Sequence, residues 1–135
     1  RVRAVLDPNV IISGWLSTGG APARILEHWR TGSFEMIASP ELIRELERVV
    51  EYPKIRKRIP PAVADAGVQS IFDNATVRSD PVDPPPVKSD DPGDDYLISL
   101  AAAGRALLVS GDKHLLALGG KIPVYAPSDF LALLD

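Results

Sequence analysis

The sequence predicts an α/β fold in which a central parallel sheet of about five strands is flanked by helices. Short apolar runs alternate with segments of helical periodicity, which is the pattern of strand and helix units that build a parallel sheet. Two of the apolar runs end in a carboxylate that opens a helical segment, at Asp7 and at Asp112. A chain of 135 residues is near the usual size of one folding unit, so we expect a single domain over residues 1–135.

The expected elements follow one another along the whole chain. Strands are predicted at residues 2–6, 34–38, 75–78, 106–109 and 123–125. Helices are predicted at residues 21–30, 40–51, 61–72, 93–103, 113–117 and 128–134. Residues 79–89 contain too many prolines for regular structure and are expected to form a stiff surface connector.

Asp7 lies between the first apolar run and a helical segment that begins with Pro8. A carboxylate in this place belongs to the carboxyl edge of a parallel sheet, where open α/β folds bind ligands. The same place also suits an ordinary helix cap, because Asp followed by Pro is a common helix start. Asp7 alone therefore leaves a ligand site and a simple cap equally open.

Two further carboxylates occupy comparable places. Asp112 follows an apolar run and opens a helical segment, as Asp7 does. Asp94 stands near the start of a helix that Asp91 is suited to cap. Helical spacing puts Asp94 on the face of the apolar residues that follow it, whereas Asp95 is turned about 100° toward the polar side. A carboxylate at the head of an apolar stripe is costly to bury unless a cation meets it.

A fourth acid is expected on the helix over residues 40–51. Glu45 and Glu47 both lie at an edge of its apolar stripe, each about 100° from the centre of the stripe. Helical periodicity does not choose between these two glutamates. Glu41 lies further from the stripe, where a solvated acid near a helix start is favourable.

Together these motifs resemble those of the PIN domain family, and in particular the PIN-family toxins of bacterial and archaeal toxin–antitoxin pairs, the VapC-like ribonucleases. The resemblance extends over the whole chain. It rests on residues 5–14, residues 39–46, the acid-rich helix start at Asp94, and residues 108–112.

The family plan implies which acids form the site. They are Asp7, Glu45, Asp94 and Asp112. The resemblance thus favours Glu45 over Glu47, and Asp94 over its acidic neighbours. Pro8 departs from the plan, because the family usually carries Thr or Ser there and this chain lacks that hydroxyl.

Carboxylates gathered in one pocket raise one another's pKa unless a cation neutralises them. Oxygen ligands, in a chain without cysteine, favour the hard ions Mg²⁺ and Mn²⁺. Such an ion binds a phosphate and activates a water molecule, and the resemblance narrows the substrate to RNA. We therefore predict a metal-dependent endoribonuclease that hydrolyses phosphodiester bonds, the toxin of a toxin–antitoxin pair.

The hypothesis gives each acid a role. Asp7 is the central metal ligand and Asp94 a second. Glu45 and Asp112 hold metal-bound waters or a second ion. Two neighbouring polar residues, Asn9 and Ser110, are expected to orient these ligands.

The net charge of −3 argues against a surface that binds nucleic acid through charge alone. A local group of cations lies just beyond the helix that carries Glu45, and consists of Lys54, Arg56, Lys57 and Arg58. These side chains are expected to hold RNA phosphates, with a solvated helical connector as the equally weighted alternative. Other cations are interpreted as surface charges, namely Arg24, Arg30, Arg44 and Arg48, and His28 and His114 as structural.

Two other functions stay open from the sequence. The departure at Pro8 is compatible with a degenerate PIN scaffold that binds RNA or a protein partner without cleavage. A metal-dependent phosphatase would use Asp7 as its nucleophile. Such enzymes usually need a second Asp two positions on, and this chain has Asn9 there.

The resemblance also implies a cognate antitoxin protein and a homodimer. Trp15, Leu16 and Trp29 are candidates for such an interface, although aromatic residues on amphipathic helices are more often part of the core. No apolar run approaches the ~20 residues of a membrane span, and no basic leader is visible. We therefore expect a cytoplasmic protein that does not bind membranes.

Overall fold

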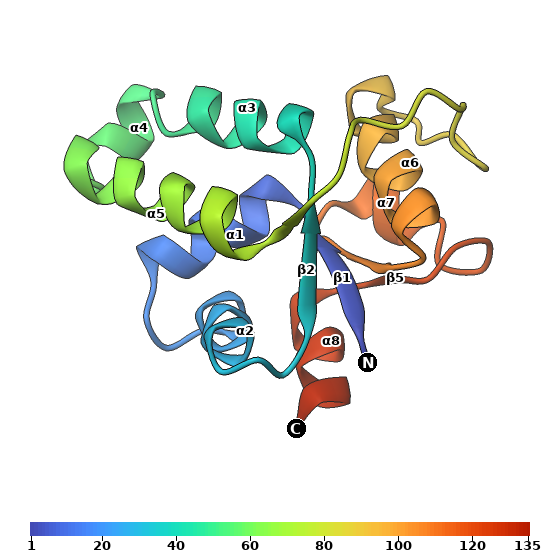
Figure 1. Cartoon of the computed structure of the whole chain (residues 1–135), viewed down its shortest axis with the longest axis horizontal. Coiled ribbons are helices and arrows are strands. Elements are labelled where there is room, and N and C mark those ends of the chain that lie inside the picture. Colours follow the sequence, from blue (N-terminus) through green and yellow to red (C-terminus); the bar gives the residue numbers. More distant parts are fainter.

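A computed structural model describes all of residues 1–135 and shows a five-stranded parallel sheet with helices on both faces (Figure 1). The strands are β1 (Arg3–Leu6), β2 (Glu35–Ala38), β3 (Thr76–Val77), β4 (Leu107–Val109) and β5 (Val124–Tyr125). Their order in the sheet is β3-β2-β1-β4-β5, and all four neighbouring pairs are parallel. The predicted fold class is confirmed, and each strand lies within its predicted segment.

Eight α-helices connect and follow these strands. They are α1 (Pro8–Leu16), α2 (Ala21–Arg30), α3 (Pro40–Val49), α4 (Pro53–Arg56), α5 (Pro61–Asn74), α6 (Asp95–Gly104), α7 (Lys113–Leu116) and α8 (Pro127–Leu134). The helix predicted over residues 93–103 was wrong at its start, because Pro92–Asp94 forms the separate 3₁₀ turn η1. The predicted proline-rich connector 79–89 has no regular structure.

The helices form two layers around the sheet (Figure 1). Helices α1, α2, α3 and α5 pack against one another on one side, and α8 joins them through α2. Helix α6 covers β1, β2 and β4 on the other side, and α7 packs on β5. The central strand is therefore covered on both faces, which explains why Ala4, Val5 and Leu6 are fully buried.

The strand order creates a switch point beside β1. The chain runs outward from β1 through β2 to β3, and then returns to the other side of β1 with β4 and β5. Connections diverge at this point, which leaves a crevice at the carboxyl ends of β1 and β4. Leu6 pairs with Val109 across these strands, so the residues that follow them emerge next to each other.

Trp15, Leu16 and Trp29 are partly buried and pack against the hydrophobic core. None of the helices is both long and apolar enough to span a membrane.

Candidate active site

A cavity of about 250 Å³ lies at the carboxyl edge of the sheet, in the crevice beside β1. Three of the four acids singled out from the sequence line it, namely Asp7, Glu45 and Asp94. The rest of the lining consists of Pro8, Asn9, Arg48, Asp91, Gly93, Tyr96 and Leu97. These residues come from α1, α3, η1 and α6 together with the end of β1, so distant parts of the chain build one acidic site.

Asp7 is the most buried acid of the site, with 5% of its surface exposed. Its Oδ1 accepts a hydrogen bond from the backbone N–H of Asn9 at 3.0 Å, which caps α1. Its Oδ2 accepts a hydrogen bond from the Ser110 hydroxyl at 2.8 Å. The predicted helix cap is therefore confirmed, and the same carboxylate also lines the cavity, where its role as a ligand stays a prediction. Asn9 supports it through its main chain.

Burial raises the pKa of Asp7 above its ordinary value, and the nearby charges of Asp112 and Glu45 raise it further. The hydrogen bonds from Asn9 and Ser110 oppose this shift, because they favour the ionised form. The carboxylate is thus held in place by donors but is not neutralised by any cation. A divalent ion would supply the missing charge.

Asp94 ends η1 and leads into α6. Its Oδ2 is buried and has no hydrogen-bond partner. Burial, followed by the charges of Asp112, Asp91 and Asp7, raises the pKa of Asp94 to about 6. A buried oxygen without a donor is costly unless a ligand meets it.

The acids next to Asp94 are occupied elsewhere. Asp91 accepts the backbone N–H of Gly93 at 3.0 Å and so caps η1. Asp95 accepts the backbone N–H of Ser89 at 2.8 Å and so holds the end of the proline-rich connector. Of the three, Asp94 is the one left without such a bond.

The two glutamates of α3 lie on different sides of the helix. Glu45 lines the acidic cavity, whereas Glu47 lines a separate hollow toward α5 together with Val50 and Asp65. Both carboxylate oxygens of Glu45 accept hydrogen bonds from the guanidinium of Arg48. Glu45 is therefore the only one of the site acids that forms an ion pair with an arginine or lysine.

Asp112 lies beside the cavity and is not part of its lining. It caps α7, where its Oδ1 accepts the backbone N–H of His114 at 2.7 Å. Its own backbone N–H donates to the Ser110 hydroxyl at 3.0 Å. Its charge nevertheless raises the pKa of both Asp7 and Asp94, so it acts on the site electrostatically.

Two lining residues were not predicted as site residues. Arg48 was interpreted as a surface charge, although its position three residues after Glu45 puts it on the same helical face. Tyr96, two residues after Asp94, also lines the cavity. Burial and the charges of Glu45 and Asp7 raise the pKa of its phenol, so the group stays protonated and remains a hydrogen-bond donor.

The carboxylates around the cavity would bind an ion through oxygen atoms, and one of these oxygens, Oδ2 of Asp94, is buried without a partner. Such ligands fit a hard divalent ion. No three histidine, cysteine, aspartate or glutamate side chains are placed to hold a metal ion by themselves. Mg²⁺ commonly takes only one or two protein carboxylates and completes its shell with water and substrate phosphate. Asp7 and Asp94 match this mode of binding.

The predicted cations lie beyond the cavity. Lys54 and Arg56 are part of α4, which follows α3 in the chain, and Lys57 and Arg58 come directly after it. Arg56 pairs with Glu51, and Arg58 donates to the backbone oxygen of Leu16. Lys54 and Lys57 are exposed and form no ion pair.

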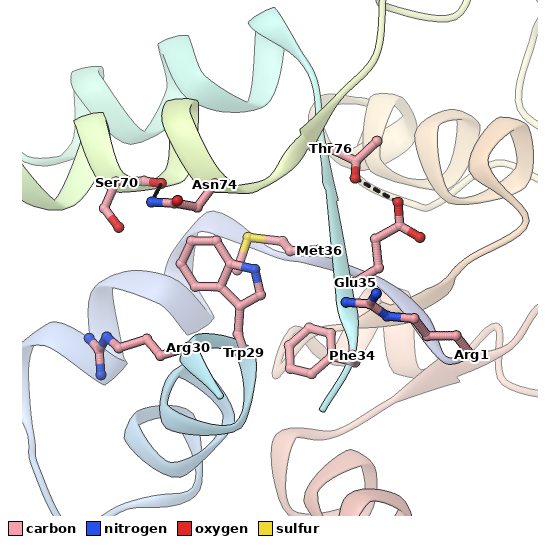
Figure 2. Close-up of a pocket in the computed structure, with 9 residues that line it drawn as sticks. All are labelled: Arg1, Trp29, Arg30, Phe34, Glu35, Met36, Ser70, Asn74 and Thr76. Carbon is pink, nitrogen blue, oxygen red and sulfur yellow. Dashed lines mark hydrogen bonds between the residues drawn. The ribbon is translucent and has the colours of Figure 1, made fainter. Parts of the chain in front are cut away.

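A second hollow, of about 460 Å³, opens at the opposite edge of the sheet, where β1, β2 and β3 begin (Figure 2). Trp29, Phe34 and Met36 form its apolar part, and its single acid, Glu35, accepts a hydrogen bond from Thr76 at 2.6 Å. It offers no group of free carboxylates. This hollow therefore lacks the several carboxylates of the acidic cavity.

Comparisons with known proteins agree with this architecture. A family model described as "PIN domain" matches residues 3–114. The uncharacterized protein MJ1680 of Methanocaldococcus jannaschii is 26% identical over 118 residues, which cover 87% of this chain and 76% of that protein. The crystal structure of PAE2754 from Pyrobaculum aerophilum superposes with a TM-score of 0.65 at 16% identity, over 98% of this chain and 89% of that one.

Proposed function

The chain belongs to the PIN domain family, and we propose that it is a metal-dependent endoribonuclease. The family has a nuclease-type fold, and its members typically use divalent metals. One observation carries the proposal for this chain. Asp7, Glu45 and Asp94 line one cavity, and the buried Oδ2 of Asp94 has no partner within the protein.

Asp7 and Asp94 would hold the ion directly, because neither carboxylate forms an ion pair within the protein, whereas Glu45 pairs with Arg48. Asp112 would contribute its charge from the side, and Ser110 would keep Asp7 in position. When bound, Mg²⁺ or Mn²⁺ neutralises the scissile phosphate and lowers the pKa of the attacking water. Tyr96 keeps its proton and can donate it in a hydrogen bond to a phosphate oxygen.

The RNA would run from the cavity along α3 toward α4. Lys54 and Lys57 are available for phosphate contacts because they are exposed and unpaired. Arg56 and Arg58, which already have partners, would contribute less. Contacts of this kind fix the position of the strand without selecting its sequence.

We further propose that the protein is the toxin of a toxin–antitoxin pair and acts as a homodimer. The support is the resemblance of its motifs to the PIN-family toxins, over residues 5–14, 39–46 and 108–112. An antitoxin that blocks the cavity would have to present cations to it, because four of its ten lining residues are acids.

The test is a cleavage assay on a labelled single-stranded RNA with Mg²⁺, Mn²⁺ or EDTA. We expect cleavage with either metal, none with EDTA, and none from Asp7→Asn or Asp94→Asn. Glu47→Gln is the matched control, since that acid lies on α3 but outside the cavity, and it should cleave as the wild type does.

A phosphomonoester substrate is tested in parallel. Release of phosphate from it, without RNA cleavage, would identify a phosphatase. RNA that is bound but never cut under any metal would identify a degenerate scaffold. Full metal-dependent activity of Asp7→Asn would remove Asp7 from the site.

A further inference from the structure

Arg48 is the only cation among the residues that line the acidic cavity. Four carboxylates and this one guanidinium give the lining a formal charge of −3. An RNA phosphate is itself an anion, so it is repelled from such a cavity until cations offset the carboxylates. One divalent ion brings the lining, Arg48 included, to about −1, so overall charge alone does not hold a phosphate and a direct hydrogen-bonded contact with a cation is needed.

The contacts of Arg48 fix its guanidinium in a defined orientation. Its Nε donates to Oε2 of Glu45 at 3.0 Å, and its Nη2 donates to Oε1 of the same side chain. Its Nη1 donates to the hydroxyl of Tyr52, and the guanidinium carbon lies 5.3 Å from the centroid of the Tyr52 ring. A flexible side chain is thus held from two sides.

These contacts use three of the five N–H groups of the guanidinium. One N–H on Nη1 and one on Nη2 remain without a partner in the protein. Two parallel N–H groups of this kind match the spacing of two phosphate oxygens.

The same contacts determine what Glu45 can do. Both of its oxygens accept hydrogen bonds from Arg48, so direct binding of an ion by Glu45 would compete with this pair. The pair as a whole carries no net charge. Its effect on an ion held by Asp7 and Asp94 is therefore small as long as the pair is intact.

We propose that Arg48 takes the place of a second metal ion: fixed by Glu45 and Tyr52, it binds the RNA phosphate, and a single divalent ion is held by Asp7 and Asp94. This inference rests on the proposed ribonuclease function and assigns the residue that contacts the substrate phosphate. Glu45 then serves as a positioning residue for Arg48.

The test measures binding of Mn²⁺ alone by titration calorimetry, and binding of a labelled RNA with Ca²⁺ in place of the catalytic metal. The wild type should bind one Mn²⁺. Arg48→Gln leaves the negative charge of Glu45 uncompensated, so we expect about three- to tenfold tighter Mn²⁺ binding and at least tenfold weaker RNA binding. Arg48→Lys keeps the charge but loses the paired N–H groups. Its Mn²⁺ affinity should equal that of the wild type, and its RNA affinity should lie between those of Arg48→Gln and the wild type.

The double variant Glu45→Gln with Arg48→Gln decides the role of Glu45. Because the pair is neutral, its removal should return Mn²⁺ affinity to the wild-type value while RNA binding stays weak. If Glu45 is a direct metal ligand, the double variant binds Mn²⁺ at least tenfold more weakly, and the inference is overturned. Arg44 lies on the same helix as Arg48, and Arg44→Gln removes only an exposed ion pair with Asp80 of the proline-rich connector, so it should change neither measurement.

The outcomes separate this inference from the proposed function. If Arg48→Gln binds both Mn²⁺ and RNA as the wild type does, Arg48 forms only a surface ion pair and the inference is overturned. Two Mn²⁺ ions bound by the wild type would also overturn the inference, although the ribonuclease function would stand. A wild type that binds RNA and Mn²⁺ in this way but never cleaves RNA would refute the function and leave the binding role of Arg48 intact.

Discussion

The hydroxyl of Ser110 donates a hydrogen bond to Oδ2 of Asp7 at 2.8 Å, although the two residues are 103 positions apart in the chain. The parallel pairing of Leu6 with Val109 brings them together, because each is the first residue after its strand. Ser110 is fully buried and also accepts the backbone N–H of Asp112 at 3.0 Å. One hydroxyl therefore joins the acid after β1 to the acid after β4.

Ser110→Ala should lower both the metal affinity of the site and the stability of the protein. The change removes the side-chain donor to Asp7 and leaves the N–H of Asp112 without its acceptor. We expect Mn²⁺ affinity to fall by roughly 10- to 100-fold, as for other residues that support metal ligands, and stability to fall by about 1–3 kcal/mol. Calorimetric Mn²⁺ titration and urea unfolding measure the two effects.

Ser39→Ala is the matched control. Ser39 is equally buried after β2, but its hydroxyl accepts the backbone N–H of Leu42 and caps α3. Its loss should cost about 1 kcal/mol and leave Mn²⁺ affinity within a factor of about two. Equal loss of metal affinity in both variants would mean that destabilisation alone weakens the site.

The stability of the metal-free protein should depend on the ionisation of Asp94. Its pKa in the folded protein is raised from 3.8 to about 6, so the folded state binds this proton more tightly than the unfolded chain does. The resulting stabilisation is complete below pH 3.8 and is lost as the pH rises through about 6. Asp94→Asn should remove this dependence and raise Tm in EDTA at pH 7.5 by roughly 3 °C, the shift that about 1 kcal/mol gives in a chain of this size. Thermal unfolding from pH 4 to pH 8 tests this, and a lower Tm for the variant at pH 7.5 would contradict it.

The same raised pKa predicts how metal binding depends on pH. A divalent ion must displace the proton from Asp94, so the apparent Mn²⁺ affinity should fall about tenfold for each pH unit below about 6 and level off above it. Titrations at pH 5, 6, 7 and 8 would show the bend. A flat profile over this range would mean that Asp94 does not release its proton on binding.

The sequence predicted the elements of the fold well, because apolar runs and helix starts are local signals. The strand segments and helix α2 lie where their patterns put them. The switch point was also predictable in kind, since Asp7 and Asp112 follow two strands of a parallel sheet. The start of α6 was not, because the turn of Pro92–Asp94 depends on the hydrogen bond from Gly93 to Asp91.

Helical periodicity could not predict which side of α3 faces the site. Glu45 and Glu47 lie at equal angles from the apolar stripe, and only the tertiary structure distinguishes them, because Glu45 borders the acidic cavity and Glu47 borders the hollow toward α5. The place of Arg48 likewise could not be predicted from the sequence, because it lines the cavity only as a result of how α3 packs beside it. Family resemblance supplied the choice of Glu45 but gave no reason to single out Arg48.

Lys54 and Lys57 should contribute to RNA binding through charge alone. Each substitution by Ala is expected to weaken binding of a single-stranded RNA by a similar factor for all sequences, and to lower the slope of log affinity against log salt by about 0.7. Lys121→Ala is the control, because this exposed lysine precedes β5, the edge strand at the other end of the sheet order from β3. Unchanged salt slopes for both variants at α4 would place the RNA path elsewhere.

Gly67 in α5 packs against the ring of Trp15 from α1, and this contact predicts an unusual response to substitution. Replacing a glycine inside a helix by alanine normally stabilises the protein, by up to about 1 kcal/mol. Here a Cβ at position 67 would lie 2.7, 2.9 and 3.0 Å from Cζ2, Cε2 and Cη2 of Trp15, closer than a rigid ring allows. Gly67→Ala should therefore destabilise the protein by about 1–3 kcal/mol, measured by urea unfolding. Trp15→Leu gives the new methyl group room, so the double variant should lose less stability than the two single losses combined. A Gly67→Ala protein more stable than the wild type would show that α1 and α5 do not pack this closely.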